Sequence, residues 1–138
     1  MKSFLHYDIK VLLALLQSIK GDKKFFKYLL NNGYPELAAW SNVIQGDVDA
    51  LHWLFDNGFA TIAIITIAID GHADAQKWIN DTHDDFLIYF TAACRKDSDG
   101  IRWLKQKNLN IFVLIAQEVQ TIQNLQEKDN TWFIYRKR

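Results

Sequence analysis

The chain has little of the cysteine, proline and long apolar sequence that mark secreted, loop-rich or membrane-spanning proteins. It contains one cysteine, Cys94, and one proline, Pro35, among 138 residues. A lone cysteine cannot form an intrachain disulfide, which favours a reducing compartment, and we predict a cytoplasmic protein. The scarcity of proline is typical of an all-helical chain, because proline disrupts helix interiors. The longest apolar run, 59–69, is far shorter than the roughly 20 residues that span a membrane, so we expect no membrane partner.

The chain also lacks an excess of either charge. Its 16 basic and 16 acidic residues give a net charge of zero, which argues against a general nucleic-acid binder. The charges are nevertheless segregated. Residues 46–99 carry ten aspartates against three basic residues, a net charge of −7, whereas residues 1–45 carry +3 and residues 100–138 carry +4. The middle of the chain is therefore acidic and both ends are basic.

Neither a glycine-rich phosphate loop nor a nucleophile motif is present in the sequence. We therefore predict a protein that is not an enzyme, with no catalytic residue, no cofactor and no metal. The densest polar cluster is His83-Asp84-Asp85. It predicts an inter-helix turn, with His83 in a left-handed conformation and one aspartate capping the next helix. The alternative that stays open is a small metal-dependent hydrolase that uses these three side chains.

The sequence does contain a repeat. Trp53, Trp78 and Trp103 stand 25 residues apart within similar surroundings. A fixed period of roughly 20–50 residues indicates an array of units that share one continuous core. The expected single domain consists of four repeats at 21–45, 46–70, 71–95 and 96–120, an N-terminal cap helix at 8–20 and a C-terminal cap at 121–138.

Each repeat predicts two short helices. In the second repeat, Asp47 can cap the first helix and Gly58 can end it. The second helix carries an apolar face at helical spacing, made of Ile62, Ile65, Thr66 and Ile69. We expect the tryptophan column of the first helices to be buried in the core beside the neighbouring leucine column.

Beyond the last repeat the register continues. Residues 121–128 match the start of another first helix. The apolar segment 132–135 is expected to fold back over the last repeat.

The first half of the repeat resembles the ankyrin repeat. The run GDVDALHWLFDNG at 46–58 shares with it an opening glycine, paired apolar residues and a closing glycine. Ala92-Ala93 resembles the small pair that closes the ankyrin inner helix. The period of 25 is shorter than the roughly 33 residues of ankyrin repeats, and the missing part corresponds to their β-hairpin. The resemblance implies an all-α fold, an α-solenoid of about five stacked antiparallel helix pairs without hairpin fingers. It also implies protein binding, which is the usual role of that family.

Aspartates recur in two columns of the repeat. Asp49, Asp74 and Asp99 share one column, and Asp56 and Asp81 share another. If neighbouring repeats pack about 10 Å apart, these columns form acidic rows along the outer face. The rows predict a protein partner with a basic surface, and a merely solubilising face is the alternative. Further candidate contacts are the inner-helix positions that face away from the core: Asn42, Ile67, Tyr89 and Gln117.

The function predicted from these features is non-catalytic protein–protein interaction. A sharper form of the hypothesis is a small inhibitor or immunity-type antagonist of a basic protein such as a nuclease. Nucleic-acid binding through the basic ends is a further alternative, with the tryptophans stacking on bases. The acidic middle opposes it, because aspartates repel phosphates.

Overall fold

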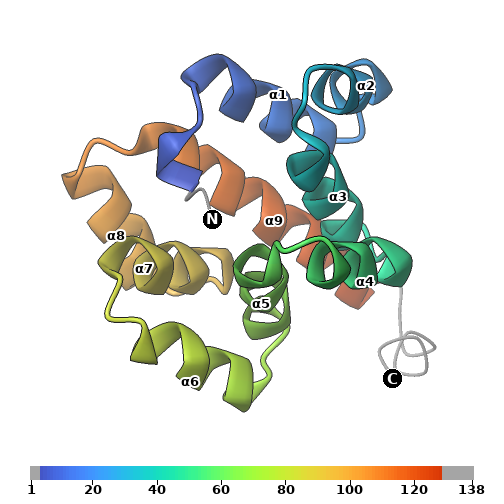
Figure 1. Cartoon of the computed structure of the whole chain (residues 1–138). Coiled ribbons are helices and arrows are strands. Elements are labelled where there is room, and N and C mark those ends of the chain that lie inside the picture. The colour runs from blue at the N-terminus through green and yellow to red at the C-terminus, as the bar shows by residue number, and fades with distance from the viewer. Residues whose placement is uncertain (1–3, 129–138) are drawn as a thin grey trace.

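A computed structural model describes residues 4–128 of the chain (Figure 1). Within these residues all regular structure is helical, which confirms the predicted all-α class. The expected fold-back segment 132–135 lies outside the described residues. The elements are η1 (Phe4–His6), α1 (Ile9–Ile19), α2 (Lys23–Asn31), α3 (Pro35–Ile44), α4 (Val48–Asp56), α5 (Ala60–Ile69), α6 (Ala73–Asp81), α7 (Asp85–Cys94), α8 (Ser98–Gln106) and α9 (Asn110–Lys128).

The helix boundaries follow the 25-residue period of the sequence. Helices α4, α6 and α8 begin at Val48, Ala73 and Ser98, and consecutive helices pack as pairs along the chain. The carboxylate of Asp47 accepts the backbone N–H of Ala50 and so caps α4, as predicted. The turns after α2, α4, α6 and α8 contain residues with positive φ, as the sequence predicts: Gly33, Gly58, His83 and Asn108. These boundaries are compatible with a helical repeat.

The helices fall into two classes by burial. We call α1, α3, α5, α7 and α9 the inner helices, and α2, α4, α6 and α8 the outer helices. Inner helices α1, α3, α5 and α7 each bury five to seven residues, whereas each outer helix buries one or two. The core therefore lies among the inner helices, and the outer helices cover it from outside.

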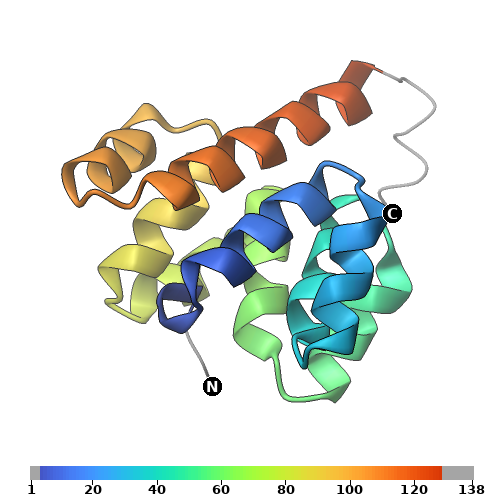
Figure 2. The same cartoon turned by 90° about the horizontal axis from the view of Figure 1, so that it is seen from above.

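The inner helices form a closed ring. Each inner helix packs against the next inner helix along the chain, and α9 also packs against α1. Figure 2 shows α9, in orange to red, lying alongside the blue α1. The first and last inner helices thus cover each other's apolar sides, which the ends of an open stack could not do.

The structure differs from the prediction after residue 120. The sequence predicts a new first helix from Thr121, but α9 continues without a turn for 19 residues, from Asn110 to Lys128. Its side-chain amides donate hydrogen bonds to carbonyls at the C-terminal ends of α7, α5 and α3, where helix ends leave acceptors without partners. The pairs are Gln120 with Ala93, Gln123 with Ile69, and Gln126 with Ile44. The extended α9 therefore ties three inner helices together at one end of the ring.

Aromatic side chains fill the middle of the helix ring. The Phe4 side chain of η1 lies with its centroid 5.3 Å from Trp40 and 5.7 Å from Phe90. Phe90 also packs against Phe86 and Phe112. All five residues are buried. Aromatic pairs in tilted, stacked and edge arrangements add to the stabilisation from burial.

Trp53 and Trp78 do not belong to this core, so the predicted burial of the tryptophan column is wrong for these two, whereas Trp103 is partly buried and packs against the core. Trp53 is 36% exposed and Trp78 is 43% exposed. The next column is buried and is made of Leu29, Leu54, Ile79 and Leu104. Adjacent residues stand about 100° apart around a helix. Because an outer helix meets the ring along a narrow stripe, that rotation is enough to bring Trp53 and Trp78 to the surface.

Candidate protein-binding surface

The outer helices place all five predicted aspartates in solvent. Asp49, Asp74 and Asp99 lie in the first turns of α4, α6 and α8, where the helix dipole favours an anion. Asp56 and Asp81 are the last residues of α4 and α6. All five are exposed, and so are the other aspartates of the acidic middle. We call the exposed sides of α4, α6 and α8 that carry these five residues the acidic faces.

Two of the five aspartates are paired with a cation of their own helix. The Nζ atom of Lys77 lies 2.7 Å from Asp81, and Nη1 of Arg102 lies 2.6 Å from Asp99. The hydrogen bond from Lys77 to Asp81 raises the pKa of the Lys77 ammonium. Within residues 4–128, the other three aspartates form no ion pair within 4.0 Å. These three carboxylates are open to a cation from another molecule.

The acidic faces also carry tryptophan, which sequence reasoning misplaced. Trp53 follows Asp49 by four residues and precedes Asp56 by three, and residues at these spacings share one side of a helix. Trp78 stands in the same relation to Asp74 and Asp81. A signal for this placement was present in the sequence, since a tryptophan between two solvent-facing aspartates at these spacings lies on their side of the helix.

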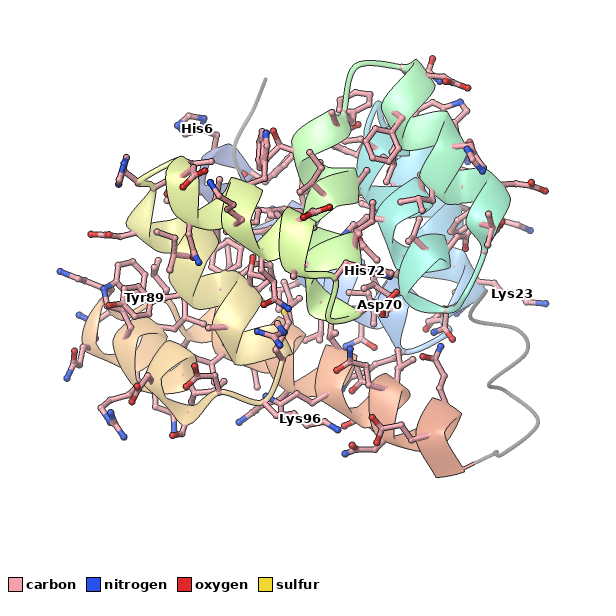
Figure 3. The ribbon with its side chains drawn as sticks, turned by 90° about the horizontal axis from the view of Figure 1, so that it is seen from below. His6, Lys23, Asp70, His72, Tyr89 and Lys96 are labelled. Atoms are coloured by element: carbon pink, nitrogen blue, oxygen red, sulfur yellow. The ribbon has the colours of Figure 1, made fainter. Side chains whose placement is uncertain are left out.

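The predicted inner-helix positions are less available. Ile67 is half-buried against the core. Tyr89, labelled in Figure 3, is half-buried and stacks on Trp103 of α8, with ring centroids 5.0 Å apart. Asn42 is half-buried, whereas Gln117 is exposed. The structure places these four residues on four different inner helices, α3, α5, α7 and α9.

The acidic faces do not form continuous rows. In Figure 1 the outer helices are spread around the helix ring, and no substantial packing contact joins two of them within residues 4–128. The expected spacing of about 10 Å, which requires packed neighbours, is therefore wrong for the outer helices. Because the inner helices close into a ring, the outer helices on its outside stand apart from one another. Each outer helix consequently presents a separate surface.

The His83-Asp84-Asp85 cluster forms the predicted turn and cap. His83 has a φ angle of 55°, and the Asp84 carboxylate accepts the backbone N–H of Leu87 at the start of α7. The structure describes no group of three or more His, Cys, Asp or Glu side chains in residues 4–128 that could hold a metal ion. Cys94 is fully buried, and burial raises the pKa of its thiol.

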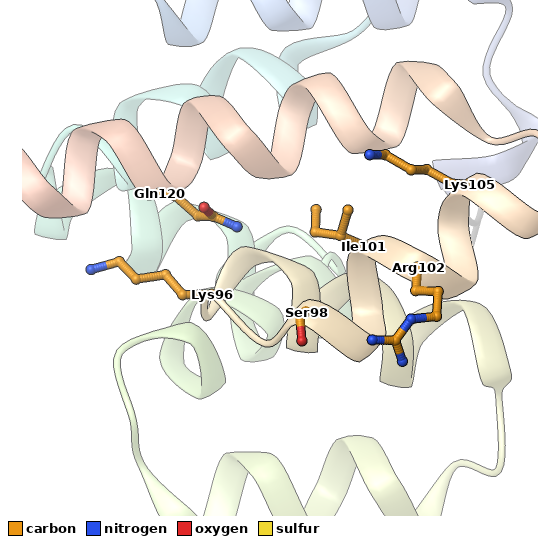
Figure 4. A pocket seen from close by; sticks show the side chains of 6 residues that line it. All are labelled: Lys96, Ser98, Ile101, Arg102, Lys105 and Gln120. Atoms are coloured by element: carbon orange, nitrogen blue, oxygen red, sulfur yellow. The ribbon is translucent and has the colours of Figure 1, made fainter.

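A groove of about 440 Å³ lies between α8 and α9 (Figure 4). Its lining residues are Lys96, Ser98, Ile101, Arg102, Lys105 and Gln120. Arg102 is held by Asp99, and Lys96 lies 3.7 Å from Glu127. Figure 4 shows Lys96 and Lys105 at opposite ends of the groove. The cations thus do not converge on one point, as a built anion site would require.

The search for membrane-spanning helices and the comparisons with known proteins give no indication of the function. No helix within residues 4–128 has the length and apolar character needed to cross a membrane. Comparisons with protein-family models, curated proteins and solved structures gave no match to this chain. The function must therefore be inferred from the surface of this chain.

Proposed function

We propose that this protein is a non-catalytic interaction module that binds a partner protein with a basic surface through its acidic faces. The observation that carries the proposal is the exposure of all ten aspartates in residues 46–99, a region with only three basic residues. A surface of this charge attracts a basic partner before contact and speeds their encounter.

The arrangement of the helices supports the same function. Paired helices at a 25-residue period resemble an ankyrin-like α-solenoid without hairpin fingers. Repeat arrays of this kind present surfaces for binding rather than enclosed sites for chemistry. Without hairpins, the faces of the outer helices take the role of the binding surface. A small inhibitor or immunity-type antagonist that masks a basic partner is the specific form we favour.

The alternatives fit the described residues less well. A hydrolase at His83, Asp84 and Asp85 would have to use a carboxylate that already caps α7. The exposure of Trp53 and Trp78 favours base stacking. The aspartates on the same helix faces oppose it, because they repel the phosphates of a nucleic acid.

The test removes the charge of the first-turn aspartates without removing their shape. The partner is isolated by affinity capture, and its association rate is measured with the wild type and with the variant Asp49→Asn, Asp74→Asn, Asp99→Asn. We expect association to slow on the order of 10-fold at low salt, and the difference to shrink as salt rises.

A matched control removes two carboxylates from α9. The variant Glu118→Gln, Glu127→Gln changes charge away from the acidic faces, so its association rate should stay close to that of the wild type. Thermal melting of each variant checks the small loss expected from the helix dipole. An unchanged association rate for the triple aspartate variant at low salt would show that the acidic faces only solubilise the protein.

A further inference from the structure

Three outer helices, α4, α6 and α8, carry the same pair of surface residues, and the three pairs differ in whether cations of residues 4–128 lie beside them. We call this pair a unit, and it consists of a tryptophan with an aspartate four residues before it: Asp49 with Trp53, Asp74 with Trp78, and Asp99 with Trp103. Because residues four apart are neighbours on a helix surface, each unit joins a carboxylate to an aromatic ring. Both groups attract cations, the first by its charge and the second by the negative face of its π-system.

In α8 this unit is already occupied by cations of the same chain. Arg102 Nη1 lies 2.6 Å from Asp99 Oδ1, and Lys107 Nζ lies 5.8 Å from the centroid of the Trp103 ring. Tyr89 stacks on the same tryptophan. Both cation-binding groups of α8 are thus satisfied within the protein.

In α4 and α6 no cation of residues 4–128 lies over the tryptophan. The residues equivalent to Lys107 are Asn57 and Thr82. Neither of their polar groups serves as a substitute: the Asn57 amide donates to the carbonyl of Trp53, and the Thr82 hydroxyl donates to the carbonyl of Ile79. Both side chains are occupied by the backbone of their own helix ends.

Among residues 4–128, Asp49 of α4 and Asp74 of α6 also have no cation beside their carboxylates. The residues equivalent to Arg102 are His52 and Lys77, and Lys77 turns to Asp81 instead of Asp74. Within residues 4–128, Asp49 and Asp74 form no ion pair. The same unit that binds two cations in α8 therefore binds none from the described part of the chain in α4 and α6.

We propose that the two units of α4 and α6, which we call the tryptophan–aspartate sites, each bind one arginine or lysine side chain of the partner. The inference rests on the proposed function and specifies which partner groups the acidic faces recognise. Arginine fits best, because its planar guanidinium can stack on the indole while it donates hydrogen bonds to the carboxylate. Trp53 stacks on Phe59 at a centroid distance of 5.9 Å, which supports the indole from one side.

The experiment follows the indole N–H resonances of the tryptophans by NMR while an acetylated tetra-arginine amide peptide is added. We expect saturable shifts at Trp53 and Trp78, and much smaller shifts at the occupied Trp103 and the buried Trp40. Trp53→Leu and Trp78→Leu should each weaken peptide binding about 2- to 5-fold, as the loss of one exposed cation–π contact predicts. Circular dichroism confirms that each variant is folded, and Trp78→Phe should retain part of the affinity.

A gain-of-binding variant provides the sharper test. Lys107→Thr combined with Arg102→His gives α8 the residues found at the equivalent positions of α6 and α4. It should produce a new peptide-dependent shift at Trp103. Absence of saturable shifts at Trp53 and Trp78, equal shifts at Trp103 in the wild type, or stronger shifts with a poly-thymidine oligonucleotide would each overturn the proposal.

The two levels of the hypothesis can fail separately. If the triple aspartate variant slows association of the captured partner but Trp53→Leu and Trp78→Leu leave its dissociation rate unchanged, the tryptophan–aspartate sites are refuted and the acidic faces stand. If the triple aspartate variant has no effect on association, the proposed function itself is refuted.

Discussion

Helices α4 and α5 are consecutive in one repeat and have nearly the same length, 9 and 10 residues. Six residues of α5 are buried, and it packs in the helix ring between α3 and α7. Of α4 only Leu54 is buried, and the helix carries two exposed aspartates and a partly exposed tryptophan. Two helices of nearly the same length in one repeat therefore have opposite surroundings.

The difference shows how the two helices of a short repeat can have different roles, one in stability and one in binding. Helices of nine or ten residues are marginal alone, so their stability comes from tertiary contacts. The inner helices supply those contacts through the closed ring. The outer helices need one buried column to stay attached, which leaves the rest of their surface free to vary. We therefore expect substitutions at buried positions to change stability and substitutions at exposed positions of the outer helices to change binding.

The largest expected effect contrasts a core aromatic with an exposed one. Phe90→Ala removes a buried ring that packs against Phe4, Trp40, Phe86 and Phe112, and should cost about 3–5 kcal/mol. Trp78→Ala should cost less than about 1 kcal/mol, because the side chain is 43% exposed. Urea unfolding measures both. Equal losses would mean that the tryptophan column is core after all.

A second effect tests how closely an outer helix approaches an inner one. A Cβ atom at Gly100 of α8 would lie 2.4 Å from the backbone nitrogen of Ala93 and 2.5 Å from the backbone carbonyl oxygen of Tyr89, both in α7. Gly100→Ala should therefore destabilise the protein by about 1–3 kcal/mol. Ala75 holds the same column in α6, and Ala75→Gly should cost about 1 kcal/mol through helix propensity. A gain in stability from Gly100→Ala would contradict the close contact of α8 with α7.

A third effect tests the hydrogen bonds that tie α9 to the ends of other inner helices. Gln120→Ala removes a hydrogen bond to the carbonyl of Ala93 and should cost about 0.5–1.5 kcal/mol. Gln117 lies one turn earlier on the same helix and is exposed, so Gln117→Ala should leave the free energy of unfolding nearly unchanged. Similar losses in both variants would assign the effect to helix composition instead of the hydrogen bond to α7.

The smallest effect is a gain. Lys96 has a φ angle of 71° at a position where the earlier repeats have Gly21, Gly46 and Gly71. Lys96→Gly should stabilise the protein by about 0.5–1 kcal/mol, because glycine adopts this conformation without a Cβ clash. Lys96→Gly also removes the exposed Lys96–Glu127 ion pair, and the variant Glu127→Gln measures the small share of the stability that this pair contributes. A loss of stability from Lys96→Gly beyond that share would show that the turn does not strain lysine.

Several features could be predicted from the sequence because they are local. Asp47 caps α4, and His83 adopts the left-handed conformation, since a cap or a turn depends on a few neighbouring residues. The exposure of Asp49 and Asp74 follows from their place on polar sides of amphipathic helices. The length of α9 had a local signal as well: the column that holds a left-handed residue at Gly21, Gly46, Gly71 and Lys96 holds Thr121 after the last repeat, and no turn forms there.

The sequence by itself determined the helices, their caps and turns, the 25-residue period and the columns of aspartate, because each depends on residue type and spacing along the chain. Only the tertiary structure decided that α9 meets α1 and that the acidic faces are separate. These two outcomes have one physical cause. Small rotations between successive repeats add up to the curvature of the array, and that curvature sets which helices touch and how far apart the outer ones stand.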